Sequence, residues 1–161
     1  MKCRECRAAE LKVSRENHRY DECGLPDVVL VGVEVRRCPE CGFETVVVPR
    51  IELLHRKLAQ TVVTHATKLT PVEIRFLRKY LGYDRGRFAQ VMGVDEGTVS
   101  HWETGRPMGA IADRLLRILV MRERPIEEYP NDALADVAKD GAPPKLRMRT
   151  NGDEWQEATA A

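Results

Sequence analysis

Two Cys-x-x-Cys pairs constrain this chain more than any other feature of its sequence. Cys3 and Cys6 open the chain, and Cys38 and Cys41 follow after a long intervening stretch. Each pair places two sulfurs on one tight turn, and two such turns supply the four corners of a tetrahedral tetrathiolate metal site. We therefore expect the N-terminus to fold back onto residues 38–41.

The number of cysteines argues against a disulfide framework. The chain has five cysteines, and the fifth, Cys23, stands outside both pairs, so we expect it to be a free or half-buried thiol. Paired Cys-x-x-Cys units in an intracellular chain are read as metal sites before disulfides. Four thiolates leave no open coordination position, so one structural Zn²⁺ per chain is predicted. Its ligands would be Cys3, Cys6, Cys38 and Cys41. Iron accepts the same geometry, and the sequence alone leaves zinc and iron open.

Length and composition allow one domain or two small ones. The chain has 161 residues, of which 43% are hydrophobic and 32% are charged, an ordinary globular composition. No apolar run approaches the roughly 20 residues that span a bilayer, and residues 1–10 lack the apolar core of a signal peptide. We expect a cytoplasmic protein without a membrane partner.

The charges are distributed unevenly although the net charge is only +1. Residues 68–124 carry 11 Lys and Arg against 7 Asp and Glu, whereas residues 125–161 carry 4 against 8. A basic middle segment is compatible with a polyanionic partner. The acidic tail over 125–161 is interrupted by prolines and is expected to be mostly flexible.

The first part of the chain is predicted to be β-rich and to end in a helix. Residues 28–37 are dense in valine, and residues 44–48 repeat the pattern, so both are expected strands that flank the second cysteine pair. From residue 51 the apolar residues recur at helical spacing, which predicts an amphipathic connecting helix over 50–66. Residues 1–66 are therefore expected to form an α+β zinc-binding lobe.

Residues 67–124 are predicted to form an all-α domain. The expected helices cover about 71–81, 85–92, 96–104 and 110–122. Thr70 is a suitable N-cap for the first of them, with Pro71 at its first position and Glu73 at the capping-box position. Gly93 and Asp95 end the second helix and begin the third.

Helical periodicity also predicts which side chains of this domain are buried. Between the second and third helices, one apolar set is expected to consist of Phe88, Met92, Val94, Val99 and Trp102. The fourth helix is expected to turn inward Ile111, Leu115, Ile118 and Leu119. Solvated faces are expected to carry Arg87, Arg114 and Arg117.

The segment 84–105 carries a second strong signal, two short helices joined by a tight turn. Its letters FAQVMGVDEGTVSHWETG are similar to the pattern of the phage-repressor (Xre/Cro) helix-turn-helix family. The resemblance implies a lambda-repressor-like domain whose second short helix enters the major groove of double-stranded DNA. It assigns DNA contacts to Arg85, Glu96, Gly97, Thr98, Ser100, His101 and Arg106. Gly97 and His101 depart from the usual family residues, which leaves the operator sequence open.

Residues 1–122 as a whole resemble the MqsA/YgiT-type antitoxins of type II toxin–antitoxin modules, because a four-cysteine lobe, a connecting helix and a helix-turn-helix follow in that order. The resemblance implies a homodimeric repressor that binds a palindromic operator and autoregulates its operon. It also implies that the zinc lobe neutralises a cognate toxin. The fourth helix and the chain after it are candidates for the dimer contact.

Two other functions stay open at this point. A stand-alone zinc-containing regulator that senses metal or redox state is the main alternative, and an electron carrier with tetrathiolate iron is a second. The sequence offers no Ser/His/Asp set, phosphate loop or convincing pair of carboxylates. We therefore do not expect an enzyme.

Overall fold

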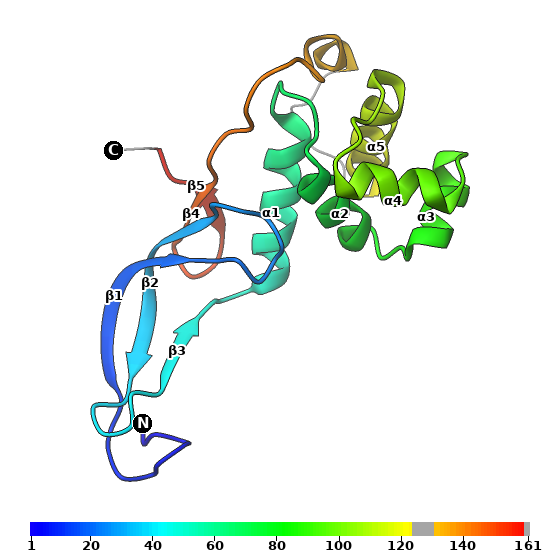
Figure 1. Ribbon diagram of the computed structural model, residues 1–161. Helices are drawn as coiled ribbons and strands as arrows, with labels where there is room; N and C mark the ends of the chain where they lie inside the picture. The colour runs from blue at the N-terminus through cyan, green and yellow to red at the C-terminus, as the bar shows by residue number, and fades with distance from the viewer. Residues whose placement is uncertain (124–130, 160–161) are drawn as a thin grey trace. The chain divides into compact units, whose positions relative to one another are not determined.

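The computed structural model describes residues 1–123 and 131–159, which form two compact units (Figure 1). Unit 1 comprises residues 1–21, 27–54 and 146–161, and unit 2 comprises residues 22–26 and 55–145. The chain is mixed α+β, with a small sheet and several helices, as the sequence predicts. Within the described ranges, no helix is long and apolar enough to cross a bilayer.

Unit 1 is built around a five-stranded sheet in which β2 has the most partners. β1 (Lys12–Arg19) pairs antiparallel along one side of β2 (Val29–Arg37). On the other side, β3 (Glu44–Val47) pairs antiparallel with the end of β2, and β4 (Arg147–Thr150) pairs parallel with its beginning. β5 (Trp155–Glu157) is the antiparallel outer neighbour of β4.

The partner of β2 changes at Gly32. β4 pairs with Val29–Val31 and β3 pairs with Glu34–Arg37, so Gly32 lies between the two pairings. Gly32 has a φ of +66°, which a residue without a Cβ adopts at little cost, and its amide donates to Asn17 Oδ1 at 3.1 Å. The β1–β2 register also shifts beside Asn17. An irregularity of this kind bends and twists a strand.

The C-terminal segment completes the core of unit 1, which corrects the expectation of a mostly flexible tail. Leu146, Met148 and Trp155 are buried, and the Trp155 indole N–H donates to the Pro49 carbonyl at 2.9 Å. The prediction followed from the composition of residues 125–161, which are acidic and contain several prolines and glycines. Composition does not reveal that the edge of β2 at Val29–Val31 pairs with β4 through backbone hydrogen bonds. The chain therefore divides differently from the expected ranges 1–66, 67–124 and 125–161.

Unit 2 consists mainly of helices, and the bounds of α1 to α5 agree with the predicted ones to within two residues. α1 runs from unit 1 into unit 2, and the others belong to unit 2 alone. They are α1 (Ile51–Thr64), α2 (Pro71–Tyr80), α3 (Arg85–Met92), α4 (Glu96–Thr104), α5 (Ala110–Glu123) and a 3-10 helix (Asn131–Asp136).

Local sequence explains where the helices of unit 2 begin and end. Thr70, Asp84 and Asp95 are the N-caps of α2, α3 and α4, and each side chain accepts a hydrogen bond from the amide three residues along. Gly93 ends α3 in the left-handed region at a φ of +71°. The Glu73 carboxylate bonds the Thr70 hydroxyl at 2.9 Å, so the first turn of α2 is also fixed by side chains.

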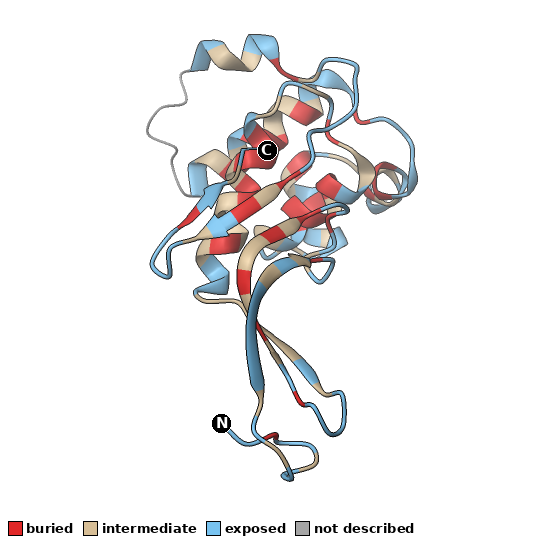
Figure 2. Cartoon of the chain, turned by 90° about the vertical axis from the view of Figure 1, so that its left-hand side faces the viewer, coloured by how far each residue is buried: buried red, intermediate tan, exposed pale blue. Residues whose placement is uncertain are grey.

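The apolar set predicted between α3 and α4 is confirmed apart from one half-exposed member. Phe88, Met92, Val99 and Trp102 are buried, and Val94 is intermediate. Figure 2 colours such residues red, and within unit 2 they lie on the inner faces of the helices. In unit 1, the same figure shows a largely exposed β1.

The prediction for the buried face of α5 is wrong. Ile111 is 85% exposed and Ile118 is 42% exposed, and Leu115 and Leu119 are intermediate. The buried residues of α5 are Asp113, Leu116, Arg117 and Val120. The prediction assumed that charged side chains of α5 are exposed. It therefore failed for a helical face whose charged side chains are buried and hydrogen-bonded.

Arg117 is the reason for this difference, and its predicted solvated position is also wrong. Its side chain is fully buried, and Nε donates to Asp113 Oδ1 at 2.7 Å. Nη1 and Nη2 donate to the carbonyls of Val63 at 3.0 Å, His65 at 2.6 Å and Thr67 at 2.7 Å. These carbonyls lie at or just beyond the C-terminal end of α1, where intrahelical partners run out. A buried guanidinium thus joins α5 to the chain between α1 and α2.

Candidate metal centre and nucleic-acid interface

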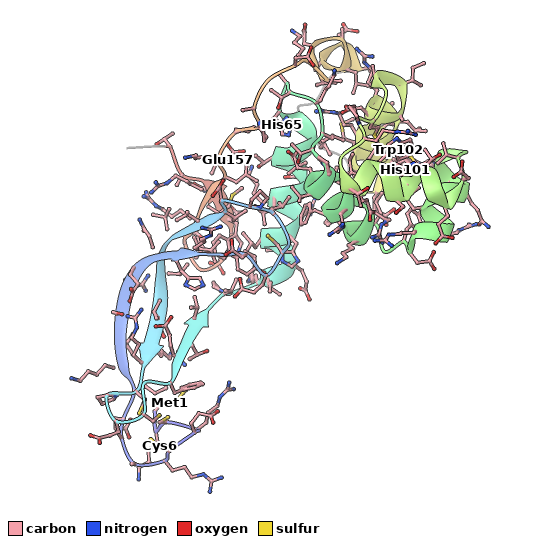
Figure 3. The ribbon with its side chains drawn as sticks, viewed as in Figure 1. Met1, Cys6, His65, His101, Trp102 and Glu157 are labelled. Carbon is pink, nitrogen blue, oxygen red and sulfur yellow. The ribbon has the colours of Figure 1, made fainter. Side chains whose placement is uncertain are left out.

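The four predicted metal ligands meet at one end of the β1–β2 ribbon. Their Sγ atoms all lie within 4.8 Å of one another, with Cys3 to Cys41 at 3.6 Å and Cys6 to Cys38 at 3.5 Å. Figure 3 places Cys6 beside Met1, with the sulfurs gathered around it. Sulfurs about 2.3 Å from a central ion form a tetrahedron with edges of about 3.8 Å, whereas a disulfide needs about 2.05 Å. The cluster fits a metal ion, and none of the five cysteines forms a disulfide.

The two cysteine turns are built in the same way. The Arg7 amide donates to the Cys3 carbonyl at 3.0 Å, and the Gly42 amide donates to the Cys38 carbonyl at 3.1 Å. The residue after each second cysteine is left-handed, with φ of +56° at Arg7 and +71° at Gly42. Two equivalent turns that face each other give the four sulfurs their tetrahedral arrangement.

The ionisation of the four thiols is uneven. The Cys6 amide is the largest cause that lowers the pKa of Cys3 to about 7. The Phe43 amide favours the thiolate of Cys41, but desolvation and the three neighbouring sulfurs outweigh it and raise the pKa of Cys41 to about 12. Four neighbouring thiolates therefore require a cation, and a metal ion that binds here displaces protons.

The two cysteine turns also contact each other through side chains that are not metal ligands. The Arg4 guanidinium of the first turn lies 4.9 Å from the centre of the Phe43 ring, which follows the second turn.

The predicted DNA-contact residues all lie in unit 2, at the start of α3, on α4 and just after α4. Arg85, Glu96, Gly97, His101 and Arg106 are exposed, and Thr98 and Ser100 are half-exposed. His101 precedes the buried Trp102 on α4 (Figure 3), so one face of this helix is exposed while the adjoining face packs inside.

Three of these residues also have local structural roles at the start of α4. The Thr98 amide and hydroxyl donate to Asp95 at 2.8 and 2.9 Å, and these bonds hold the pKa of Asp95 below its usual value. A Cβ on Gly97 would lie 3.0 Å from Asp95 Oδ1, so glycine suits this cap. Glu96 Oε2 lies 3.6 Å from the position of a Cβ on Gly86, which places its carboxylate near the start of α3.

Glu103, which no sequence pattern singled out, is a buried carboxylate that pairs with three arginines. Its side chain is fully buried and pairs with Arg75, Arg78 and Arg85. Burial opposes ionisation, but hydrogen bonds from Arg78 and Arg85 outweigh it and hold the pKa of Glu103 below its usual value. Its position directly after Trp102, a member of the predicted apolar set, was the one feature of the sequence that could have indicated its burial.

The fifth cysteine and three of the histidines lie outside the predicted metal and DNA sites. Cys23 is half-buried and, with His55, lines a cleft of about 260 Å³ in unit 2. Burial lowers the pKa of His55. His18 lies in β1, and the buried His65 side chain bonds Glu73.

Comparisons with protein-family models, curated proteins and solved structures returned no significant match. The functional assignment therefore depends on the residues of this chain.

Proposed function

We propose that unit 2 binds double-stranded DNA through a helix-turn-helix formed by α3 and α4, and that the protein is a transcriptional repressor. The observation that carries this proposal is the two-faced character of α4. Its buried face holds Val99 and Trp102 against α3, and its exposed edge presents Glu96, Ser100 and His101 at partial or full exposure. A helix held in this way can enter the major groove with its polar edge.

Affinity and sequence choice come from different residues in this proposal. Arg85 and Arg106 contact phosphates, which gives most of the affinity and a steep dependence on salt. His101 and Ser100 reach base edges, and His101 can read a base by one hydrogen bond. Thr98 contributes less, because its hydroxyl already bonds Asp95.

The DNA-binding form is a homodimer on a palindromic operator, because modules of this kind bind two half-sites related by two-fold symmetry. The exposed Ile111 and Ile118 on α5 support this proposal, since they lie seven residues apart on one helical face. Apolar side chains at this spacing on a surface helix are suited to contact with a second copy.

The metal at the four cysteines is one structural Zn²⁺ per chain in this proposal. Soft thiolates select zinc or iron, and a full set of four leaves no position for a substrate. Metal analysis together with an absorption spectrum distinguishes the two ions, because tetrathiolate iron is coloured and zinc is not. The site would hold the ion in unit 1 and brace the two cysteine turns.

The biological role we propose is that of a cytoplasmic antitoxin which autoregulates its operon and neutralises a cognate toxin through unit 1. This part depends on the resemblance of residues 1–122 to MqsA/YgiT-type antitoxins. Co-expression with the product of the adjacent reading frame tests it. A stable complex that forms with unit 1 supports the role, and two proteins that purify separately contradict it.

Fluorescence anisotropy with the chain's own promoter fragment tests DNA binding directly. We expect tight binding that weakens steeply between about 50 and 200 mM salt, with much weaker binding to a random duplex. His101→Ala should reduce the preference for the promoter by about 0.5–1.5 kcal/mol, the usual contribution of a single hydrogen bond. Ile118→Ser should weaken binding through the dimer. Equal affinity for both duplexes contradicts sequence-specific binding.

A further inference from the structure

Glu103 joins three arginines that differ in exposure. Arg78 is 9% exposed and bonds both carboxylate oxygens, with Nη2 to Oε2 at 3.3 Å, while its Nη1 donates to the Tyr83 carbonyl at 2.8 Å. Arg78 thus balances the buried negative charge of Glu103. The Arg75 and Arg85 side chains are 41% and 46% exposed.

The two half-exposed arginines converge on the same oxygen. Nε of Arg85 donates to Glu103 Oε2 at 3.2 Å, and Nε of Arg75 lies 3.5 Å from that atom. Arg75 Nη2 also donates to the Glu103 backbone carbonyl at 3.2 Å. Arg75 comes from α2 and Arg85 from the first position of α3, so one carboxylate on α4 orients two guanidinium groups from two other helices.

The charges of this cluster do not cancel. Three arginines face one carboxylate, which leaves two positive charges on the half-exposed members. Asp84 adjoins Arg85 in the chain, but its carboxylate caps α3 by accepting from the Arg87 amide at 2.7 Å. Guanidinium groups offer planar pairs of donors that match the oxygens of a phosphate.

We propose that Arg75 and Arg85, oriented by Glu103, form a clamp for one phosphodiester group of duplex DNA. The proposal rests on the DNA-binding function of unit 2 and adds Arg75 to its binding residues, with Glu103 as a positioning residue. Because a phosphate is common to all sequences, the clamp sets affinity and position on the duplex and not base preference.

The salt dependence of DNA binding tests the clamp. Each lost phosphate contact lowers the slope of log K against log salt by about 0.9, so R75Q and R85Q should each reduce it by about that amount and the double variant by about 1.8. Affinity should fall several-fold, and equally for promoter and random duplex. R75K and R85K retain the charge and should keep most of the slope.

The matched control is R19Q, which removes the same charge from the exposed Arg19 of unit 1 and should leave the slope unchanged. Thermal unfolding of each variant verifies that α2 and α3 remain folded. Inorganic phosphate at constant ionic strength should not displace the duplex. Displacement at submillimolar concentration would assign the site to free phosphate and overturn the proposal.

The outcomes separate the clamp from the proposed function. If the wild-type chain binds no duplex, DNA binding by unit 2 is wrong. If the wild type binds with a steep slope that R75Q, R85Q and the double variant leave unchanged, the clamp alone is wrong. A slope that falls as strongly in R19Q also overturns it, because the effect would then reflect net charge.

Discussion

Units 1 and 2 are stabilised by different interactions. Unit 2 has apolar side chains between its helices and buried ion pairs that include Arg78 with Glu103 and Arg117 with Asp113. In unit 1, most side chains of β1 are at least half-exposed. Among the described strands, β3 alone pairs with the part of the β1–β2 ribbon beside the cysteines. So narrow a sheet is marginal by itself in water. We therefore expect metal binding to order the end of unit 1 that carries the four cysteines and to have little effect on unit 2.

Metal removal should have the largest effect and should separate the two units. Stripping the metal with a chelator, or the variant Cys38→Ser, should disorder the cysteine turns, because metal binding supplies much of the folding free energy of such small lobes. Hydrogen exchange should show lost protection at residues 2–10 and 38–43, while amides of α3 and α4 stay protected. An equal loss of hydrogen-exchange protection in both units would contradict the expectation that the metal orders unit 1 alone.

Replacement of Arg117 should affect unit 2 next most strongly. Arg117→Ala leaves the Asp113 carboxylate and three carbonyls without their buried donors. We expect a loss of about 3–5 kcal/mol in the free energy of unfolding, measured by urea denaturation. Arg122→Ala, at an exposed position of the same helix, is the control and should change stability by less than about 0.5 kcal/mol.

The C-terminal strands provide a third test, now in unit 1. Trp155→Ala removes a buried side chain and its hydrogen bond to Pro49, so we expect a loss of about 3 kcal/mol or more. Gln156→Ala, at the exposed neighbouring position, is the control. If the unfolding midpoint is the same for both variants, β4 and β5 do not contribute to the core of unit 1.

The smallest expected effect concerns the N-cap of α4 and depends on pH. Hydrogen bonds from Thr98 lower the pKa of Asp95, so the folded chain favours the carboxylate. This contribution is present above the ordinary pKa of the carboxyl, near 3.8, and is lost as pH falls through the lower folded value. Asp95→Asn should therefore lower the thermal midpoint slightly at pH 7 and not at pH 2. A difference that grows in acid would contradict this sign.

The helix ends and the cysteine cluster could be predicted from the sequence, because each depends on a short and recognisable motif. The bounds of α3 and α4 follow from N-cap aspartates and the left-handed Gly93, and the cysteine cluster follows from its two spacings. The capping residues lie directly beside the helix ends that they determine. The cysteines are distant in sequence, but two Cys-x-x-Cys pairs are typical of a single kind of site, a metal site.

Features that depend on distant partners could not be predicted. The burial of Arg117 requires carbonyls from the chain around Val63 and Thr67, which no periodicity within α5 encodes. Residues 145–150 have the pattern of a strand, but their parallel pairing with Val29–Val31 of β2 depends on a distant sheet edge that this short segment does not encode. Glu103 was missed for the same reason, because its three partners come from α2 and α3.

We propose that unit 2 binds DNA with the exposed edge of α4 and that this binding does not depend on a metal held by the four cysteines of unit 1. The most direct measurement is an anisotropy titration of the promoter fragment with metal-loaded and metal-stripped full-length protein, at about 50 and 200 mM salt. We expect the two forms to bind with affinities that agree within about twofold at each salt concentration and that fall steeply between the two concentrations. Loss of binding on metal removal alone would contradict this expectation and favour a metal-sensing regulator, and absence of binding in both forms would remove the DNA-binding function.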